Sequence, residues 1–237
     1  MGRQRSKNKL GCGGMKEVCI IVAMLKEAEP IVRQFDSIVE HNVFGRRAFI
    51  GRLNGEKLSV IVSGVGKVNA AVCTQIAYDY LSADIIINIG VAGGLNNTVE
   101  IGEMYEIYNA VQYDFDLSEV NGTKIGTLDG MYSNYLTFDV TQMDARRLAT
   151  ADRFNDSKED NVLLTQILDA DVRDMEGAAI LQACYFNDIE CYCYKVISDK
   201  FGSGSTVEQY QLNLEKCLKK IGEKIPTILK RVYGKER

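Results

Sequence analysis

The 237-residue sequence predicts one α/β domain built around a mostly buried, mixed β-sheet. Near-continuous apolar runs at residues 17–24, 84–89 and 190–197 are typical of strands that are covered on both faces. Helical patterns alternate with these runs, which favours helices packed against the sheet. No linker rich in Pro or Ser and no internal repeat follows residue 15, so residues 15–237 are expected to form a single domain.

The first half of the chain shows helix and hairpin signals in sequence order. A helix is expected after the first strand, over residues 28–39. Residues 47–53 and 57–63 flank Asn54-Gly55, a strong signal for a type I′ β-hairpin. A helical pattern then runs from residue 68 to residue 80 and leads to the second apolar strand.

The second half continues the alternation of strands and helices. Strands are expected at residues 103–113 and 147–151, and a helix rich in small residues at 175–186. The last element is a long amphipathic helix over residues 207–232, interrupted only by Pro226.

The charge distribution argues against a nucleic-acid-binding protein. The formal net charge is −4, and residues 1–14 carry four basic residues and no acid, so residues 15–237 hold 24 basic and 32 acidic residues. Such a domain offers no basic face to a nucleic-acid backbone. Residues 1–14 are expected to be a disordered or non-native tail, because they are polar, Gly-rich and without the apolar core of a secretory signal.

Composition also excludes other classes. No uninterrupted apolar run reaches the roughly 18 residues of a membrane span, so no membrane partner is expected. The seven cysteines are an odd number in a chain too long to need disulfides, and we interpret them as reduced core thiols of a cytoplasmic protein. His41 is the only histidine, so a Ser-His-Asp or Cys-His site would have to use it, and we expect no metal site.

Two glycine-rich segments follow predicted strands. Residues 63–69 (SGVGKVN) lack both the earlier glycine and the Ser or Thr after Lys67 that a phosphate-binding P-loop needs. A dinucleotide fingerprint would need an acid at the end of the next strand, whereas Asp84 begins that strand. The loop at residues 90–94 (GVAGG) follows a buried strand at an edge where α/β sheets bind ligands, and it fits either ligand approach or a tight strand exit.

Five short segments, taken together, occur in a characteristic order. They are residues 23–27 (AMLKE), 63–71 (SGVGKVNAA), 88–95 (NIGVAGGL), 174–179 (DMEGAA) and 197–199 (ISD). In the order and spacing of these segments, the chain resembles the purine nucleoside phosphorylase/uridine phosphorylase superfamily from about residue 15 to the C-terminus. Within it, the chain is most similar to the family of 5′-methylthioadenosine/S-adenosylhomocysteine nucleosidases.

This resemblance implies a fold and an activity. The implied fold is a three-layer α/β/α sandwich around a mixed, barrel-like central sheet. The implied protein is a homodimer that binds a small-molecule purine nucleoside and hydrolyses its N-glycosidic bond without a metal or organic cofactor. Its substrates would be adenine nucleosides of the 5′-methylthioadenosine or S-adenosylhomocysteine class, and its products adenine and a thioribose sugar.

The resemblance assigns the reaction to two carboxylates. Asp199, at the end of the last predicted strand, is implied as the general acid that protonates the purine. Glu27 is implied to direct the attacking water, although a carboxylate there would also suit the N-terminus of a helix. An adenine anion leaves slowly, so protonation of the base and negative charge near the ribose are what the chemistry needs.

Eight further residues are implied to contact the substrate. Glu176 would accept hydrogen bonds from the ribose hydroxyls, since burying an acid among small residues is costly without a partner. Met175 would lie against the sugar, with ordinary core packing as the alternative. Phe154 would stack on the purine, and the backbone of Asn155 would contact the edge of the base. The other implied contacts are Ser198, Ala23, Val91 and Gly93.

Two positions depart from the family pattern. Val91 replaces a serine, which removes a hydroxyl from the ribose and water side of the pocket. Lys195 replaces an arginine four residues before Asp199, which keeps the charge but loses the planar donor fork.

Three alternatives to this activity stay open. A phosphorylase would need an arginine-lined anion pocket, to which Arg46 and Arg47 could contribute from a neighbouring subunit. The substrate could be another nucleoside, such as a futalosine-type compound. The protein could also bind nucleosides without turning them over.

Overall fold

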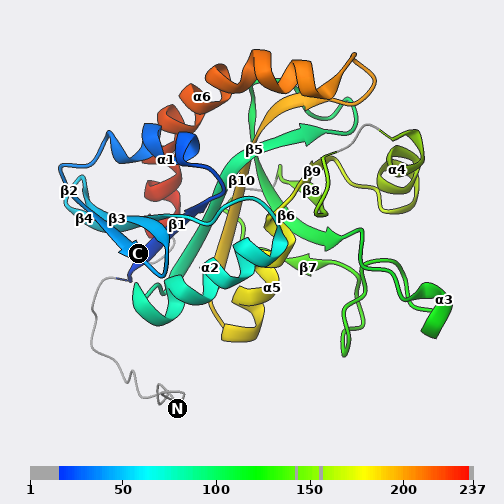
Figure 1. The fold of residues 1–237 in the computed structure, drawn as a ribbon, viewed down its shortest axis with the longest axis horizontal. Coiled ribbons are helices and arrows are strands. Elements are labelled where there is room, and N and C mark those ends of the chain that lie inside the picture. The colour runs from blue at the N-terminus through cyan, green and yellow to red at the C-terminus, as the bar shows by residue number, and fades with distance from the viewer. Residues whose placement is uncertain (1–15, 142–143, 155–156, 235–237) are drawn as a thin grey trace.

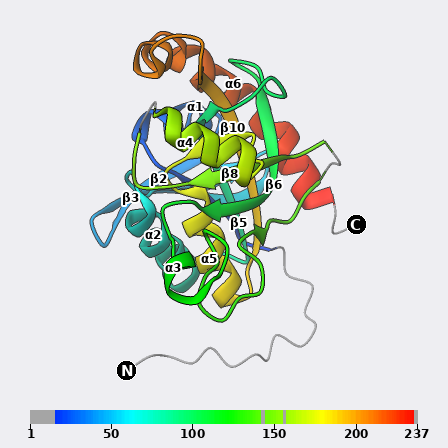
Figure 2. The same cartoon turned by 90° about the vertical axis from the view of Figure 1, so that its right-hand side faces the viewer.

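A computed structural model describes residues 16–141, 144–154 and 157–234. Within these residues, ten strands form one mixed sheet with helices on both faces, and the two views of the ribbon agree on this layering (Figures 1 and 2). None of the described helices is long and apolar enough to cross a membrane. The predicted tail at residues 1–14 and the predicted contact Asn155 lie outside the described residues.

The elements follow the predicted alternation. The strands are β1 (Val18–Val22), β2 (Ser37–Val43), β3 (Arg46–Leu53), β4 (Glu56–Val62), β5 (Ile85–Gly94), β6 (Met104–Gln112), β7 (Leu136–Thr137), β8 (Arg146–Thr150), β9 (Val172–Asp174) and β10 (Glu190–Lys200). The helices are α1 (Leu25–Val32), α2 (Lys67–Tyr80), α3 (Ser118–Asn121), α4 (Lys158–Val162), the π-helix η1 (Leu163–Ile167), α5 (Gly177–Asn187) and α6 (Thr206–Gly234).

The sheet closes on itself around β5. β5 pairs in parallel with β1 on one side and with β10 on the other, and β10 continues through β6, β8 and β9 back to the end of β5. The β1 side of the sheet extends outward through β4, β3 and β2 as a hairpin edge. The predicted barrel-like mixed sheet is therefore confirmed.

The two helical layers each bury a separate apolar cluster. α2 and α5 pack on one face of the sheet over a cluster that includes Cys73, Ile86 and Ile180. α1 and α6 pack on the other face over a cluster that includes Ile31, Ile87 and Ile221. This confirms the three-layer sandwich, in which the strands are covered on both faces and read as continuous apolar runs.

The prediction of a loop at residues 90–94 is wrong. β5 continues through Gly94, because Gly93 and Gly94 pair with β9 after the partner strand β1 has ended. At Gly94 an added Cβ would lie 2.8 Å from Val99 Cγ2, so a larger residue would not fit there. Gly93 and Gly94 therefore allow β5 to change its partner from β1 to β9 without ending the strand.

The predicted helix at residues 28–39 is too long. α1 ends at Val32, and Ser37–Val43 form β2 instead, paired antiparallel with β3. This pairing joins an exposed segment to a hairpin strand, a tertiary contact that periodicity within residues 28–39 does not reveal. The hairpin itself is as predicted, with Asn54 at φ 53° and Gly55 at φ 81°, both positive as a type I′ turn requires.

The packing of α6 yields a stability prediction. Ile221 is fully buried against the sheet, whereas Leu212 on the same helix is 80% exposed. Ile221→Ala should lower the free energy of unfolding by about 2–5 kcal/mol, because it leaves a cavity in the core. The matched variant Leu212→Ala should change it by no more than about 0.5 kcal/mol in the same denaturant titration. Equal effects of the two variants would contradict the assignment of the buried face.

Candidate active site

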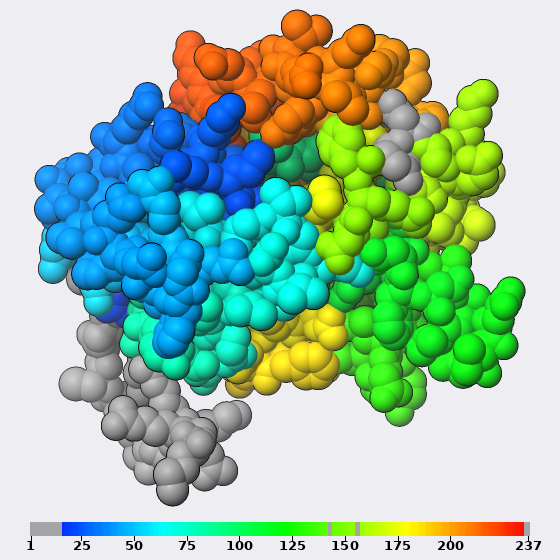
Figure 3. Space-filling view, viewed as in Figure 1, coloured from blue at the N-terminus to red at the C-terminus, as the bar shows by residue number. Residues whose placement is uncertain are grey.

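A cavity of about 370 Å³ opens where β1, β5 and β10 end. In the space-filling view it appears as a hollow among the blue, cyan, yellow and orange segments, which lie far apart in the sequence (Figure 3). Its lining includes seven predicted site residues: Ala23, Glu27, Val91, Phe154, Met175, Glu176 and Ser198. The lining residues that sequence analysis missed are Met24, Val65, Asp174, Val207, Tyr210 and Gln211.

Glu27 is held in the cavity wall by backbone N–H groups. Its Oε2 accepts from Ala23 N at 3.0 Å and Met24 N at 2.9 Å, and its Oε1 accepts from Val91 N at 2.9 Å. Glu27 therefore caps α1, as the alternative reading allowed, and also ties α1 to β5. Burial raises the pKa of Glu27, against the lowering effect of these N–H groups and of Lys195. A carboxylate with a raised pKa that lines a cavity has the properties of a general base.

Glu176 is oriented by the first glycine-rich segment. The N–H of Gly66 donates to its Oε1 at 2.9 Å, and the side chain is 7% exposed. Asp152 Oδ1 accepts from the next N–H, that of Lys67, at 2.7 Å. The N-terminus of α2 thus binds two carboxylates of the protein itself, the arrangement that a helix N-terminus favours. Met175, the neighbour of Glu176, lines the cavity as predicted.

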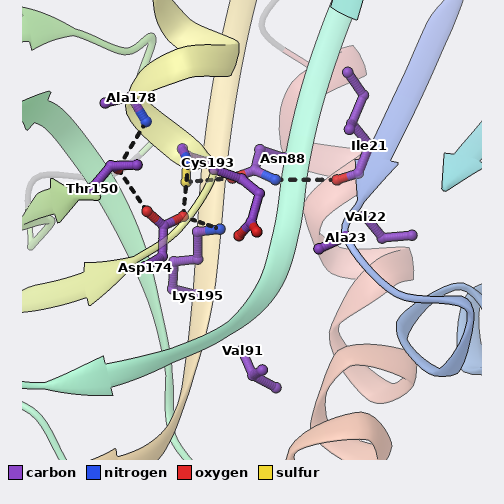
Figure 4. A network of polar contacts seen from close by, with 12 residues as sticks. Ile21, Val22, Ala23, Asn88, Val91, Thr150, Asp174, Ala178, Cys193 and Lys195 are labelled. Carbon is purple, nitrogen blue, oxygen red and sulfur yellow. Dashed lines mark hydrogen bonds and ion pairs between the residues drawn. The ribbon is translucent and has the colours of Figure 1, made fainter. Parts of the chain in front are cut away.

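A buried ion pair lies behind these acids. Lys195 Nζ contacts Asp174 Oδ2 at 2.8 Å, and each side chain is 1% exposed. Asp174 also accepts from Thr150 Oγ1 at 2.6 Å and from Gly177 N at 2.8 Å, and Thr150 Oγ1 accepts from Ala178 N (Figure 4). Burial alone would lower the pKa of Lys195, but the negative charge of Asp174 raises it above its usual range. Lys195 is therefore a permanent cation beside the cavity.

Asp199 lies directly behind a lining residue. The register of β10 against β5 shifts between Ile197 and Asp199, so Ser198 occupies a bulge and lines the cavity. The Ser198 hydroxyl donates to Asp199 Oδ1 at 2.6 Å. The Asp199 carboxylate itself is 1% exposed and is not among the lining residues. The structure therefore brings the predicted acid to the cavity wall but not to its surface.

Aromatic rings stand at the cavity rim. Phe154 is 49% exposed, and its ring meets Tyr210 of α6 edge to face, with 6.0 Å between ring centroids. The Tyr210 hydroxyl donates to Met24 Sδ at 3.5 Å. Tyr210 falls within the amphipathic helix predicted over residues 207–232, and helical periodicity does not distinguish a core position from a cavity position.

The described lining of the cavity is acidic and contains no Lys or Arg. Within the chain, Arg46 donates to Asn69 Oδ1 at 2.7 Å, and Arg47 pairs with the exposed Glu40. No group of three or more His, Cys, Asp or Glu side chains among the described residues is arranged to hold a metal ion. The site therefore offers acid–base and hydrogen-bonding groups.

A closed mixed sheet with a carboxylate-lined cavity at its strand ends defines an α/β protein that binds a small molecule. The family model described as "Phosphorylase superfamily" matches residues 17–232, and the chain belongs to this superfamily. The superfamily to which the five sequence segments pointed is confirmed.

Known proteins of related sequence carry nucleosidase names. The 5′-methylthioadenosine/S-adenosylhomocysteine nucleosidase of Anoxybacillus flavithermus is 28% identical over 205 residues, covering 80% of this chain and 88% of the relative. The aminodeoxyfutalosine nucleosidase of Campylobacter jejuni is 24% identical over 200 residues, covering 79% and 87%. A Helicobacter pylori nucleosidase mutant, solved with 5′-methylthioadenosine in its active site, has a TM-score of 0.85 at 21% identity, covering 91% and 99%. This last likeness confirms the fold.

The environment of Glu176 predicts how stability depends on pH. Burial and the nearby Asp174 carboxylate raise the pKa of Glu176 to about 7 from 4.5, against the opposing effects of Lys195 and the Gly66 N–H. Between these values the folded state holds the proton and the unfolded state does not, so ionisation of Glu176 costs stability as pH rises through this window. Glu176→Gln removes that cost.

The measurement is the free energy of unfolding of the wild type and Glu176→Gln at pH 4.5 and pH 8. The stability of the variant relative to the wild type should rise by up to about 3 kcal/mol between the two pH values. A difference that is the same at both pH values would show that Glu176 titrates normally.

Proposed function

We propose that the protein hydrolyses the N-glycosidic bond of a purine nucleoside, with adenine nucleosides of the 5′-methylthioadenosine/S-adenosylhomocysteine class as substrates. The observation that carries the proposal is the Glu27 carboxylate, fixed by three N–H groups in a cavity whose described lining has no basic side chain. A water molecule can be activated there, whereas a phosphate nucleophile would be repelled. The names of the curated relatives support the same class of reaction.

The carboxylates divide the reaction between them. Glu176, oriented by Gly66 N–H, accepts hydrogen bonds from the ribose hydroxyls, while Met175 packs against the sugar. The water oxygen bonds to C1′ of the ribose while Glu27 takes a proton from that water. The C1′–N9 bond breaks, and Asp199 gives a proton to N7 so that the base leaves neutral. Exchange with solvent then returns Asp199 to the acid and Glu27 to the carboxylate.

The base occupies the side of the cavity formed by Ser198 and Phe154. Phe154 supplies an apolar face for the purine, and Ser198 lies between the cavity and Asp199. The N–H groups of Ala23 and Val91 act through Glu27, which they hold. Gly93 acts by leaving room for the side chain of Asp199, since an added Cβ would lie 2.8 Å from Asp199 Oδ2.

A nucleoside with a polar 5′ substituent, of the futalosine type, is the second candidate substrate. The polar side chains of Tyr210 and Gln211 and the apolar Val207 line the cavity from α6, and the apolar Val65 lines it from the segment before α2. A thioether would contact the apolar pair, and a polar substituent would hydrogen-bond to the other two. The relative from Campylobacter jejuni carries a name of this second type.

The assay that tests hydrolysis compares nucleosides with and without phosphate. Methylthioadenosine, S-adenosylhomocysteine and an aminodeoxyfutalosine should release free base and free sugar at rates that do not depend on phosphate, and inosine serves as the 6-oxopurine comparison. Asp199→Asn and Glu27→Gln should each lower kcat by about 100-fold or more, because each removes one proton-transfer group. Glu208→Gln, an exposed acid on α6, serves as the matched control.

A phosphate-dependent release of sugar 1-phosphate would assign the protein to the phosphorylases. Full activity of Glu27→Gln would contradict the water-activating role, and full activity of Asp199→Asn the acid role. Nucleoside binding without any release of base by the wild type would identify a binding protein.

We further propose a homodimer that covers the outer face of α2. Val68, Val72 and Tyr80 on this helix are 74%, 48% and 61% exposed. Phe44 of the β2–β3 turn packs on Tyr80 with 4.5 Å between ring centroids and is itself 65% exposed. An apolar patch of this kind is typical of a protein interface. Val65, which lines the cavity, is also 47% exposed, so a partner on this face would lie beside the cavity.

Sedimentation equilibrium tests the dimer. The wild type should have twice the chain mass of 26.4 kDa, and the double variant Val68→Lys with Val72→Lys should have the single-chain mass. Two lysines in an apolar interface lose their hydration without gaining a partner. Leu212→Lys, at a position on α6 that is 80% exposed, should remain dimeric. A wild type of single-chain mass would overturn the proposal.

The proposal also includes a cytoplasmic location and a single catalytic domain. Six cysteines of the described residues are buried free thiols, which supports a reducing, cytoplasmic compartment. Residues 15–237 are proposed as one catalytic domain, in agreement with the extent of the family match.

A further inference from the structure

Arg173, which sequence analysis did not single out, forms an ion pair with Asp199. Arg173 lies on β9, and its Nη2 is 3.5 Å from Asp199 Oδ2 on β10. The two strands lie on opposite sides of β5, where Arg173 pairs with Gly93. A Cβ at Gly93 would lie 2.9 Å from Arg173 Nε and 2.8 Å from Asp199 Oδ2. The glycine therefore permits the two side chains to meet across the strand.

The pair stands directly behind the base side of the cavity. Ser198, Asp174 and Met175 line the cavity, and each is a close chain neighbour of Asp199 or Arg173. The Arg173 side chain is 11% exposed and that of Asp199 is 1% exposed. Neither residue is among those that line the cavity, and Arg173 Nη2 and Asp199 Oδ2 are both buried. Because these two atoms face each other, a base that reaches Asp199 Oδ2 also comes within reach of Arg173 Nη2.

Purine bases present two different hydrogen-bonding edges to such a pair. Adenine offers an acceptor at N7 and a donor at N6, whereas a 6-oxopurine offers acceptors at both N7 and O6. A carboxylic acid alone matches adenine, because one of its oxygens donates and the other accepts. Against a 6-oxopurine, the second carboxyl oxygen would face O6, and two acceptors would repel each other.

Arg173 can relieve the repulsion between the carboxyl oxygen and O6, because its guanidinium lies next to Asp199 Oδ2. A guanidinium carries only donors, arranged in a planar fork, and pairs well with O6 and N7 of a 6-oxopurine. With Arg173 beside the acid, the wall presents a donor for O6 as well as an acceptor for N6.

We propose that Arg173 is a specificity-determining residue that allows the site to accept 6-oxopurine nucleosides in addition to adenine nucleosides. The proposal rests on the proposed hydrolysis and on the role of Asp199 in it. It assigns to Arg173 the contact with O6 of the base, while Asp199 keeps the protonation of N7.

The test uses two nucleosides that differ only at C6, 5′-methylthioadenosine and 5′-methylthioinosine. The wild type should hydrolyse both. Arg173→Met should lower kcat/KM for the 6-oxo nucleoside about tenfold or more relative to the 6-amino nucleoside, as expected for a lost base contact. Arg146→Met is the matched control, since Arg146 is also largely buried but pairs with Asp144 and not with Asp199. A ratio that Arg173→Met leaves unchanged, or a wild type that hydrolyses only the 6-amino nucleoside, would overturn the proposal.

Binding of the free bases separates this proposal from the proposed hydrolysis. Calorimetric titration with hypoxanthine and adenine needs no turnover. If the wild type hydrolyses neither nucleoside, the proposed hydrolysis fails, and base binding alone decides the role of Arg173. Selective loss of hypoxanthine affinity in Arg173→Met supports the role, and equal affinities in wild type and variant refute it.

Discussion

The site depends on burying several carboxylates with few cations to balance them. Glu27, Glu176 and Asp199 are each at most 7% exposed, and the Asp174 side chain is 1% exposed. Burying a charge is costly unless hydrogen bonds or an opposite charge compensate it. Backbone N–H groups at the end of β1, on β5 and at the N-terminus of α2 compensate Glu27 and Glu176. Lys195 pairs with Asp174, and Arg173 with Asp199, so each carboxylate depends on where the strands and α2 meet. The strand pairing that builds the sheet therefore also determines where the carboxylates of the cavity lie.

Much of the fold was readable from the sequence because the buried strands are apolar on both faces. β1, β5, β10 and α6 were located, as was the hairpin at Asn54-Gly55. The elements that were missed or misplaced depend on distant partners. β2 is largely exposed and forms by pairing with β3, and the three-residue β9 forms between β5 and β8. Neither has the long apolar run by which the buried strands were located.

The site was predictable to the extent that its residues belong to short ordered motifs. Seven predicted residues line one cavity. Six of them belong to segments 23–27, 88–95, 174–179 and 197–199, which could suggest the site only together. The sequence carried no functional signal at Tyr210, Val207 or Arg173. An aromatic or aliphatic residue is ordinary in an amphipathic helix, and a charged residue is ordinary near the end of a strand. The bulge at Ser198 was equally hidden, because it is a property of the pairing between β10 and β5.

One lysine shared among several acids explains why the cavity suits a cationic transition state. A Cβ at Gly90 would lie 2.9 Å from Glu27 Oε1 and 3.7 Å from Lys195 Nζ, so both groups converge on the same glycine. The Lys195 charge lowers the pKa of Glu27 and of Glu176, but it is already paired with Asp174. When Glu27, Glu176 and Asp174 are all ionised, the negative charge of these acids exceeds the single positive charge of Lys195. Positive charge that develops on a ribose during bond cleavage would relieve that excess, whereas an incoming anion would add to it. Burial and the negative charges of Asp174 and Glu27 raise the pKa of Glu176. The same excess of negative charge would favour loss of the base to water over attack by phosphate.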